Sequence, residues 1–235
     1  MTPSNKSLRA VLLFGPPGSG KGTQADLLAT RLGFFHVDSS KALEEWFRNV
    51  DDEEAIEVDG QKYYALDERK LWEGGILMSP PVVAHIMQEK IRQVHSAAKD
   101  IVTSGSLRTL YEATHLYPIL EELYGKENIM AFFLKLDEEQ SIYRNSHRRI
   151  CELVRHSILW SEETEKLLHC PLDGSTLVKR ENLDDEETIK IRLREYAERT
   201  EPVFAYLEKN EISLKEIDGN RPVAPVFQDI QHDLA

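Results

Sequence analysis

The sequence predicts an α/β fold, a doubly wound parallel sheet of about five strands with helices on both faces. Short apolar runs alternate along the chain with longer segments of helical periodicity, which is the order that builds such sheets. The first run and the first helical segment enclose a glycine-rich turn at residues 15–23. The 235 residues suffice for one domain of this kind with insertions.

The strands are expected where β-forming residues cluster between turn signals, at residues 10–14, 34–37, 100–103, 129–136 and 213–217. Helical spacing predicts helices at residues 24–32, 39–47, 67–72, 82–98, 109–124 and 185–201, and two more that begin at residues 137 and 222. Gly33 suits a helix C-terminus, and Asp38 and Asp137 suit N-caps. Pro118 is expected to disturb its helix, and Pro202 to kink the helix before it or to start another. The acidic, aperiodic residues 49–60 are expected to form a loop or a local excursion of the chain.

The composition limits which classes of binding partner and which cellular compartment are expected for this protein. The net charge of −12 argues against nucleic acid as the main partner, so an anionic ligand must be met by locally gathered arginines and lysines. Two cysteines are too few for a secreted disulfide scaffold. The first apolar run is too short for a signal peptide, and no run approaches the roughly 20 residues of a membrane span. A cytoplasmic protein without membrane contact is therefore expected.

The glycine-rich turn has the spacing of a phosphate-binding loop. It reads Gly-Pro-Pro-Gly-Ser-Gly-Lys-Gly-Thr and lies between a strand and a helix, the setting that such a loop requires. Glycines let the backbone wrap an anion, and amides at the helix N-terminus point at it. The alternative is a tight turn that carries a lysine by chance. The candidate phosphate-binding residues are Gly15, Pro16, Gly18, Ser19, Gly20, Lys21, Gly22 and Thr23.

Several arginines follow the later elements. Arg144 and Arg148 share one helix face, and like charges at that spacing repel unless an anion or neighbouring glutamates compensate. Arg108 follows a predicted strand at the carboxyl edge of the sheet, where doubly wound folds bind ligands. Arg180 and Arg192 lie among acidic residues, which fits a solvated helix face as well as a ligand site.

The ending Gly-Lys-Gly-Thr-Gln-Ala at residues 20–25 resembles the adenylate kinase family of nucleoside monophosphate kinases. The resemblance covers most of the chain in order. The family's Asp-Gly-Phe-Pro-Arg-Thr is similar to residues 104–109, its Arg-x-x-x-Arg-Arg to residues 144–149, its lid exit to residues 180–193 and its Val-Asp-Gly-x-x-Pro-Val to residues 217–223. It implies transfer of the γ-phosphoryl of Mg-ATP to AMP or a related monophosphate, by a monomer that closes a lid to exclude water.

The resemblance also implies roles for individual residues. Lys21 and the loop amides would hold the phosphates of ATP, with Arg144 and the backbone near Arg221 beside its base. Arg148, Arg180 and Arg192 would close on the transferring phosphoryl, and Arg108 would hold the acceptor phosphate. The acceptor site would include Ser39, Gly105, Arg108 and Glu112. The implied division is core 1–37, monophosphate-binding insertion 38–91, core 92–150, lid 151–184 and core 185–235.

The acceptor half departs from the family pattern at three positions. Glu44 replaces an arginine that grips the acceptor phosphate, Ser104 an aspartate that orders Mg²⁺ and its waters, and Glu112 a glutamine that reads adenine. These changes leave the acceptor open. They also motivate two alternatives, a non-catalytic ATP-binding module and a kinase with a non-nucleotide acceptor.

The lid of zinc-containing members carries four ligands in two Cys-x-x-Cys-like pairs. Here Cys151, Cys170 and Asp173 match, but Val154 replaces the fourth ligand, and His156 or His169 would have to supply it. Structural zinc requires four ligands. A lid without zinc, in which the three remaining ligand residues are vestigial, is therefore the expectation. A zinc-bound lid is the alternative.

Overall fold

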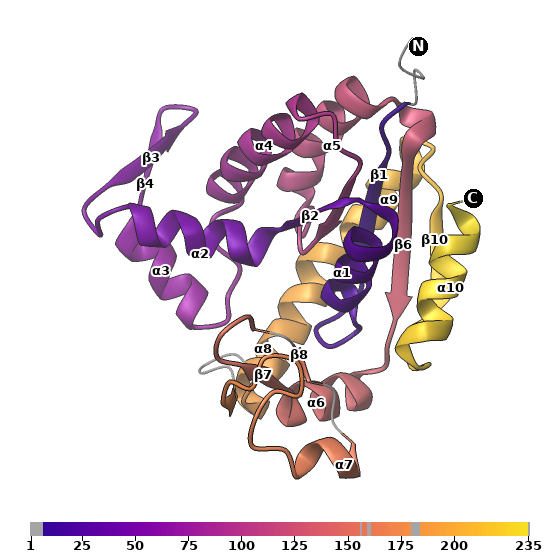
Figure 1. Ribbon diagram of the computed structural model, residues 1–235. Coiled ribbons are helices and arrows are strands. Elements are labelled where there is room, and N and C mark those ends of the chain that lie inside the picture. Colours follow the sequence, from indigo (N-terminus) through magenta and orange to yellow (C-terminus); the bar gives the residue numbers. More distant parts are fainter. Residues whose placement is uncertain (1–6, 156, 159–160, 180–183, 235) are drawn as a thin grey trace.

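Five parallel strands form the central sheet, in the order β10-β6-β1-β5-β2. Figure 1 shows this sheet in the computed structural model, which describes residues 7–155, 157–158, 161–179 and 184–234. The strands are β1 Ala10–Phe14, β2 Phe35–Asp38, β5 Ile101–Ser104, β6 Ile129–Lys135 and β10 Leu214–Asp218. Each lies within a residue or two of its predicted position. The α/β fold and its parallel sheet are therefore confirmed.

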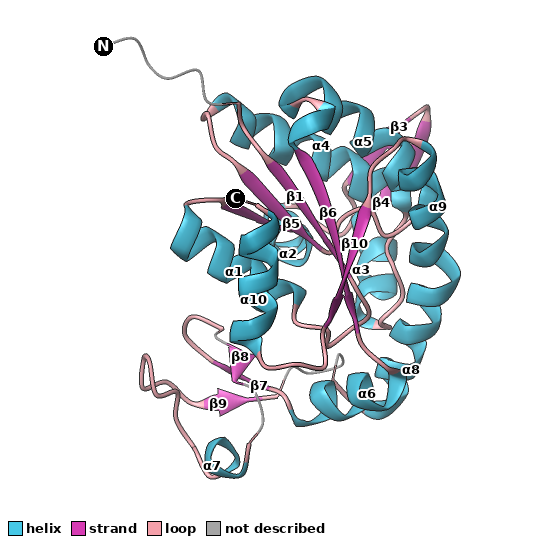
Figure 2. Ribbon diagram, turned by 90° about the vertical axis from the view of Figure 1, so that its right-hand side faces the viewer, coloured by secondary structure: helices cyan, strands magenta, loops and turns pink. Residues whose placement is uncertain are grey.

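Helices cover both faces of the sheet, as Figure 2 shows. One face packs against α1 (Lys21–Leu32) and α10 (Val223–Asp233), through Val11 and Leu13 of β1. The other packs mainly against α4 (Pro80–Ser96), α5 (Leu110–Tyr124) and α9 (Glu201–Lys209), through alternate β1 residues such as Leu12. Burial on both sides explains why β1 reads as a continuous apolar run.

The caps expected from the sequence define several helix ends. Gly33 ends α1 with a φ of 77°, a left-handed conformation that suits glycine. The Asp38 carboxylate accepts the Ser40 amide at the start of α2 (Ser39–Asn49), and Asp137 accepts the Gln140 amide at the start of α6 (Glu138–His147). Asp185 likewise caps α8 (Glu186–Glu195).

Two local predictions need correction. Residues 49–60 do not form a simple loop, because they contain β3 (Ala55–Val58), which pairs with β4 (Gln61–Tyr64) before α3 (Ala65–Glu73). Pro118 does not break α5. A proline costs a helix about 3 kcal/mol, but burial of side chains such as Leu116 and Leu120, at about 1.5–3 kcal/mol each, outweighs it.

The long helix that follows the lid agrees with its prediction, because α8 leads through a π-helical segment, Tyr196–Thr200, into a new helix, α9, that begins beside Pro202. Within that segment the Thr200 hydroxyl donates to the Arg108 carbonyl oxygen at 2.9 Å. The widened turn therefore joins the helix to the loop after β5, at the edge of the sheet where the strands end.

Two further parts lie at the carboxyl edge of the sheet. Strands β7 (Arg149–Cys151), β8 (Ser157–Ile158) and β9 (Leu177–Val178) form a small antiparallel sheet with the single turn α7 (Glu162–Glu165). Figure 1 shows them below the central sheet, with α2, α3 and the β3–β4 hairpin to the left. A short 3₁₀ turn, Lys126–Asn128, precedes β6. Among the described residues, no helix is long and apolar enough to cross a membrane.

Candidate active site

The glycine-rich loop leads directly into the N-terminus of α1. Lys21 folds back over the loop, where its Nζ donates to the carbonyl oxygens of Gly15 at 2.6 Å and Pro16 at 2.9 Å. Gly20 is the N-cap with a φ of 92° and brings no side chain over the first-turn amides, where Gly22 and Thr23 follow. The loop therefore presents amides and one lysine to an anion, as the spacing predicts.

The loop is fixed from behind by α6. The Ser141 hydroxyl donates to the Pro17 carbonyl oxygen at 2.6 Å, and a Cβ on Gly18 would lie 2.6 Å from Nδ2 of Asn145. A Cβ on Gly15 would lie 2.6 Å from the Leu134 carbonyl oxygen. These close approaches require glycine and hold the loop rigid. No pattern in the sequence indicates Ser141 or Asn145, since they contact the loop only through the fold.

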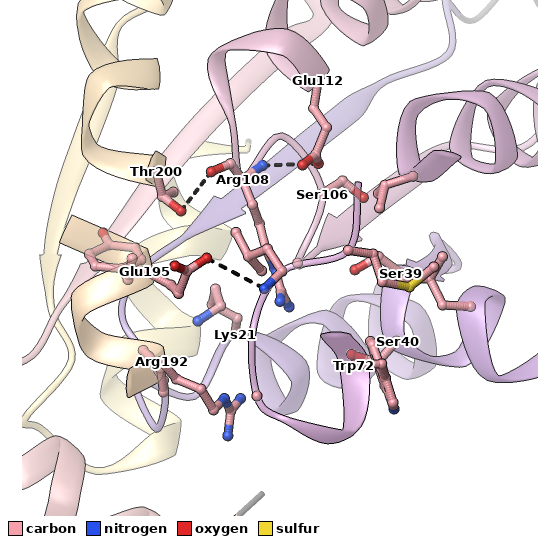
Figure 3. Close-up of a pocket in the computed structure, with 18 of the residues that line it drawn as sticks. Lys21, Ser39, Ser40, Trp72, Ser106, Arg108, Glu112, Arg192, Glu195 and Thr200 are labelled. Atoms are coloured by element: carbon pink, nitrogen blue, oxygen red, sulfur yellow. Dashed lines mark hydrogen bonds between the residues drawn. The ribbon is translucent and has the colours of Figure 1, made fainter. Parts of the chain in front are cut away.

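A cavity opens between this loop, the insertion and α8. Figure 3 shows Lys21, Arg108 and Arg192 around it, although they come from α1, the loop after β5 and α8. The insertion closes against α8, because a Cβ on Gly75 would lie 2.7 Å from Cγ2 of Thr188. The lining residues used below are Lys21, Ser39, Leu43, Glu44, Trp72, Ile76, Met78, Val83, Gly105, Ser106, Arg108, Glu112, Arg192, Glu195, Tyr196 and Thr200.

The cavity is strongly electropositive near the loop. Burial lowers the pKa of Lys21 well below its ordinary value, and the charges of Arg108, Arg192 and Arg148 lower it further. Three arginines from three other segments thus repel the charge of Lys21. An anion bound there would relieve that repulsion and raise the pKa of Lys21 again. The site is therefore built for a highly charged anionic ligand.

Arg108 is held by its own loop. The Glu112 carboxylate accepts the Arg108 amide at 3.1 Å and the Thr109 hydroxyl at 3.0 Å. Burial lowers the pKa of the Arg108 guanidinium, while Glu112 and Asp38 oppose that shift. Burial also raises the pKa of the Glu112 carboxyl, while the Arg108 amide and charge and the Thr109 hydroxyl lower it. The Arg108 guanidinium is therefore positioned to bind an anionic group of a ligand.

Gly105 lets Arg108 meet Ser39. A Cβ on Gly105, whose φ is 83°, would lie 2.6 Å from Nη2 of Arg108 and 2.6 Å from Oγ of Ser39. The three predicted acceptor residues Ser39, Gly105 and Arg108 are therefore brought together in one close-packed corner of the cavity.

Asp184 joins two of the predicted phosphoryl-contacting arginines. Its side chain is 1% exposed and accepts Nε of Arg148 at 3.2 Å and also its Nη2, while Nη1 of Arg192 lies 4.0 Å away. A buried carboxylate between two arginines fixes their direction. Sequence analysis included Asp184 only as part of the lid exit. Arg180 lies outside the described residues.

Arg144 and Arg221 lie at the turn between β10 and α10. Arg144 donates to the carbonyl oxygens of Gly219 at 2.8 Å and Asn220 at 3.0 Å, and burial lowers the pKa of its guanidinium. Arg221 turns away to an ion pair with Asp229. The arrangement brings Arg144 and the backbone before Arg221 together, and it leaves the Arg221 side chain engaged on α10.

Ser104 belongs to a hydrogen-bonded chain that sequence analysis missed. Its hydroxyl lies 2.7 Å from Nε2 of His36, and Nδ1 of His36 lies 2.8 Å from the Asp26 carboxylate. With the ring proton on Nδ1, His36 donates to Asp26 and accepts the Ser104 hydroxyl. The chain joins α1, β2 and β5 beneath the loop. Only the two-residue periodicity of β2 could have hinted that His36 faces α1.

Glu44, on α2, faces the small antiparallel sheet rather than an acceptor arginine. Its carboxylate lies 3.8 Å from the Arg155 guanidinium, which follows β7. Both side chains are partly exposed, so the pair contributes little energy. It nevertheless places the insertion and the small sheet against each other across the cavity mouth.

Three of the predicted metal ligands lie together. The ligand atoms of Cys151, Cys170 and Asp173 are within 4.8 Å of one another, and the Cys151 thiol donates to Asp173 at 3.0 Å. Hydrogen bonds from Cys151 and Ser175 lower the pKa of Asp173. Val154 is 55% exposed and has no ligand atom, and His156 lies outside the described residues. Two thiols and a carboxylate are ligands of the kinds that zinc binds, but a closed structural zinc site requires a fourth ligand.

Comparison with known proteins extends over nearly the whole chain. A family model described as adenylate kinase matches residues 13–212. An adenylate kinase of Clostridium acetobutylicum is 30% identical over 95% of this chain and 98% of its own length. Adenylate kinases of Elusimicrobium minutum and Petrotoga mobilis are 29% and 30% identical and cover 94% of this chain, with 95% and 94% of their own lengths. The chain therefore belongs to the adenylate kinase family, a family of phosphotransferases.

Proposed function

We propose that this nucleoside monophosphate kinase transfers the γ-phosphoryl of Mg-ATP to a nucleoside monophosphate. The observation that carries the proposal is the meeting of Lys21, Arg108 and Arg192 in one cavity, from three separate segments. Phosphoryl transfer requires in-line positioning and charge stabilisation more than covalent help from the protein. A cluster of mutually repelling cations supplies that stabilisation once phosphates enter.

The residue roles follow from position. Lys21 and the loop amides hold the ATP phosphates, with Mg²⁺ arriving on the nucleotide. Arg144 and the Gly219–Asn220 backbone face the ATP base. Arg108, with Ser39 and Gly105, holds the acceptor phosphate. Arg148 and Arg192, oriented by Asp184, stabilise the charge on the transferring group. The family resemblance, rather than position, adds Arg180 to this set.

The insertion 38–91 and the lid 151–184 are proposed to close over the bound substrates. Closure would exclude water, which otherwise takes the phosphoryl group. The ion pair between Glu44 and Arg155 and the contact between Gly75 and Thr188 support it, because they bring the parts together over the cavity.

The test is a coupled assay of diphosphate formation from Mg-ATP against AMP, GMP, CMP, UMP and their deoxy forms, with Lys21→Ala as control. We expect one monophosphate to react and the variant to lose activity by at least about 10³-fold. Absence of turnover with saturable ATP binding would refute the proposal and favour a non-catalytic ATP-binding module. Turnover that only a non-nucleotide acceptor elicits would favour a small-molecule kinase.

A further inference from the structure

Two buried hydroxyls in the cavity wall have no hydrogen-bond partner among the described residues. They are Oγ of Ser106, a residue 4% exposed, and the hydroxyl of Tyr196. Both residues line the cavity, from the loop after β5 and from the π-helical segment. Buried polar groups are nearly always satisfied, so two unpaired hydroxyls on residues that line the cavity indicate that a ligand completes the hydrogen bonding of this wall. Polar atoms of the ligand are therefore expected at this wall, away from its phosphate.

Glu112 adds a third polar group with unused capacity. It is 2% exposed, whereas the other two glutamates of the wall, Glu44 and Glu195, are only partly buried. An ionised carboxylate only accepts, and it has about four lone-pair sites. The Arg108 amide and the Thr109 hydroxyl use two of them. Glu112 can therefore accept two further hydrogen bonds from a ligand.

The rest of the wall fits a planar ring. Leu43, Trp72, Ile76, Met78 and Val83 give it an apolar lining. In the view of Figure 3, Ser106 and Glu112 lie on one side of the Arg108 side chain, and Lys21 and Arg192 lie on the other. A ligand with its phosphate at Arg108 can thus place its base between the apolar side chains, with one edge toward Glu112 and Ser106.

The hydrogen-bonding pattern discriminates among bases. Guanine presents two adjacent donors, N1–H and the 2-amino group, beside an acceptor, O6. An ionised carboxylate matches the two donors, and a hydroxyl can donate to O6. Adenine instead presents the unprotonated N1 next to its amino group, so its lone pair would face a carboxylate oxygen. Uracil offers one ring-edge donor, N3–H, between two acceptors, and cytosine offers one donor group, its amino group, next to the acceptor N3.

We infer that the acceptor is a guanine nucleoside monophosphate, read by Glu112 with help from Ser106 and Tyr196. The inference rests on the proposed function, since it assigns the monophosphate to the same cavity. A matched pair of hydrogen bonds to a base edge discriminates by roughly 10- to 100-fold. The kcat/KM for GMP should therefore exceed that for AMP by about that factor.

The experiment compares kcat/KM for GMP and AMP in wild type, Glu112→Gln and Ser106→Ala at about pH 8, because burial raises the pKa of Glu112 and an alkaline pH favours the ionised carboxyl. The Glu112→Gln amide keeps the shape of the side chain but can donate to adenine N1. We expect it to invert the preference, with a change of the GMP/AMP ratio of about 100-fold or more. Ser106→Ala should lower GMP use about tenfold and leave AMP use unchanged. General damage to the fold lowers both rates and leaves their ratio unchanged.

Equilibrium binding separates this inference from the proposed function. GMP and AMP are titrated into wild type and both variants by calorimetry, without ATP. Tighter binding of GMP that Glu112→Gln reverses supports the inference even if no diphosphate forms, in which case the proposed function alone fails. Wild-type preference for AMP, or a GMP/AMP ratio that both variants leave unchanged, overturns the inference.

Discussion

Replacing Gly105 with alanine tests the corner in which Ser39 and Arg108 meet. The new Cβ would lie 2.6 Å from Nη2 of Arg108 and from Oγ of Ser39, and ordinary contact begins at 3.4 Å. The neighbours must yield by 3.4 − 2.6 = 0.8 Å. Displacement of a substrate-positioning group by about 1 Å can cost about 10²-fold in rate. The φ of 83° adds a left-handed strain of about 1–2 kcal/mol for alanine.

Gly33→Ala is the matched control. Gly33 has a φ of 77° at the end of α1, and nothing lies within 4 Å of the Cβ it would gain. It therefore carries the same backbone strain without the collision. Both variants should lose about 1–2 kcal/mol of unfolding free energy, which lowers the melting temperature by about 2–4 °C per kcal/mol in a chain of this size.

The assays are thermal unfolding and steady-state kinetics with each substrate varied in turn. Gly105→Ala should lower kcat/KM for the monophosphate by about 10²-fold and change the Kd for ATP little, whereas Gly33→Ala should keep both. Equal kinetic losses in the two variants would show that strain, rather than the approach of Arg108 to Ser39, explains the need for glycine.

Three further predictions follow from the electrostatics of the site. ATP binding should weaken by up to tenfold per pH unit as the pH rises through the lowered pKa of free Lys21, because bound phosphate raises that pKa and binding then takes up a proton. Calorimetry should show no such pH dependence in Lys21→Met. An identical pH dependence in the variant would contradict the assignment to Lys21. Asp184→Asn should lose about 1.5–3 kcal/mol of unfolding free energy and lower kcat by about 10²-fold. Asp185→Asn, which removes only the cap of α8, should lose about 1 kcal/mol of unfolding free energy and keep its kcat. An unchanged kcat in Asp184→Asn would rule out its orienting role. Val154→Cys should retain zinc through chelator treatment and unfold at a higher temperature than the wild type. Stoichiometric, chelator-resistant zinc in the wild type would show that its three ligands suffice.

The sheet and the loop could be predicted because their signals are local. The loop is one unbroken run of glycines around Lys21, and β1 is an unbroken apolar run because both of its faces are buried. Position at a strand end also located Arg108. The β3–β4 hairpin escaped prediction because its strands have four residues each and are mostly exposed. The apolar side chains that pack against the core from them, Ile56 and Tyr63, are too few to give a periodic signal.

The support behind the loop could not be predicted in the same way. Ser141 contacts Pro17 across 124 residues of sequence, and His36 contacts Ser104 across 68. Such pairs are set by the packing of α6 and β2 against the loop and β5. Nothing in the spacing of either residue indicates a partner so distant. The π-helical turn that bonds Thr200 to Arg108 is likewise a product of tertiary packing.

The residues of the acceptor half that differ from the family pattern indicate an altered binding site rather than one that has lost its function. A site that has lost its function is expected to leave charges and hydroxyls without defined partners. Here Ser104 is bonded to His36, Glu44 faces Arg155, and Glu112 accepts both an amide and a hydroxyl. Among the described residues of the cavity wall, the buried hydroxyls of Ser106 and Tyr196 are the groups without a partner. A wall whose substituted residues all have defined partners is what a different acceptor base requires, and it is why substrate selectivity, rather than activity alone, is the decisive property to measure.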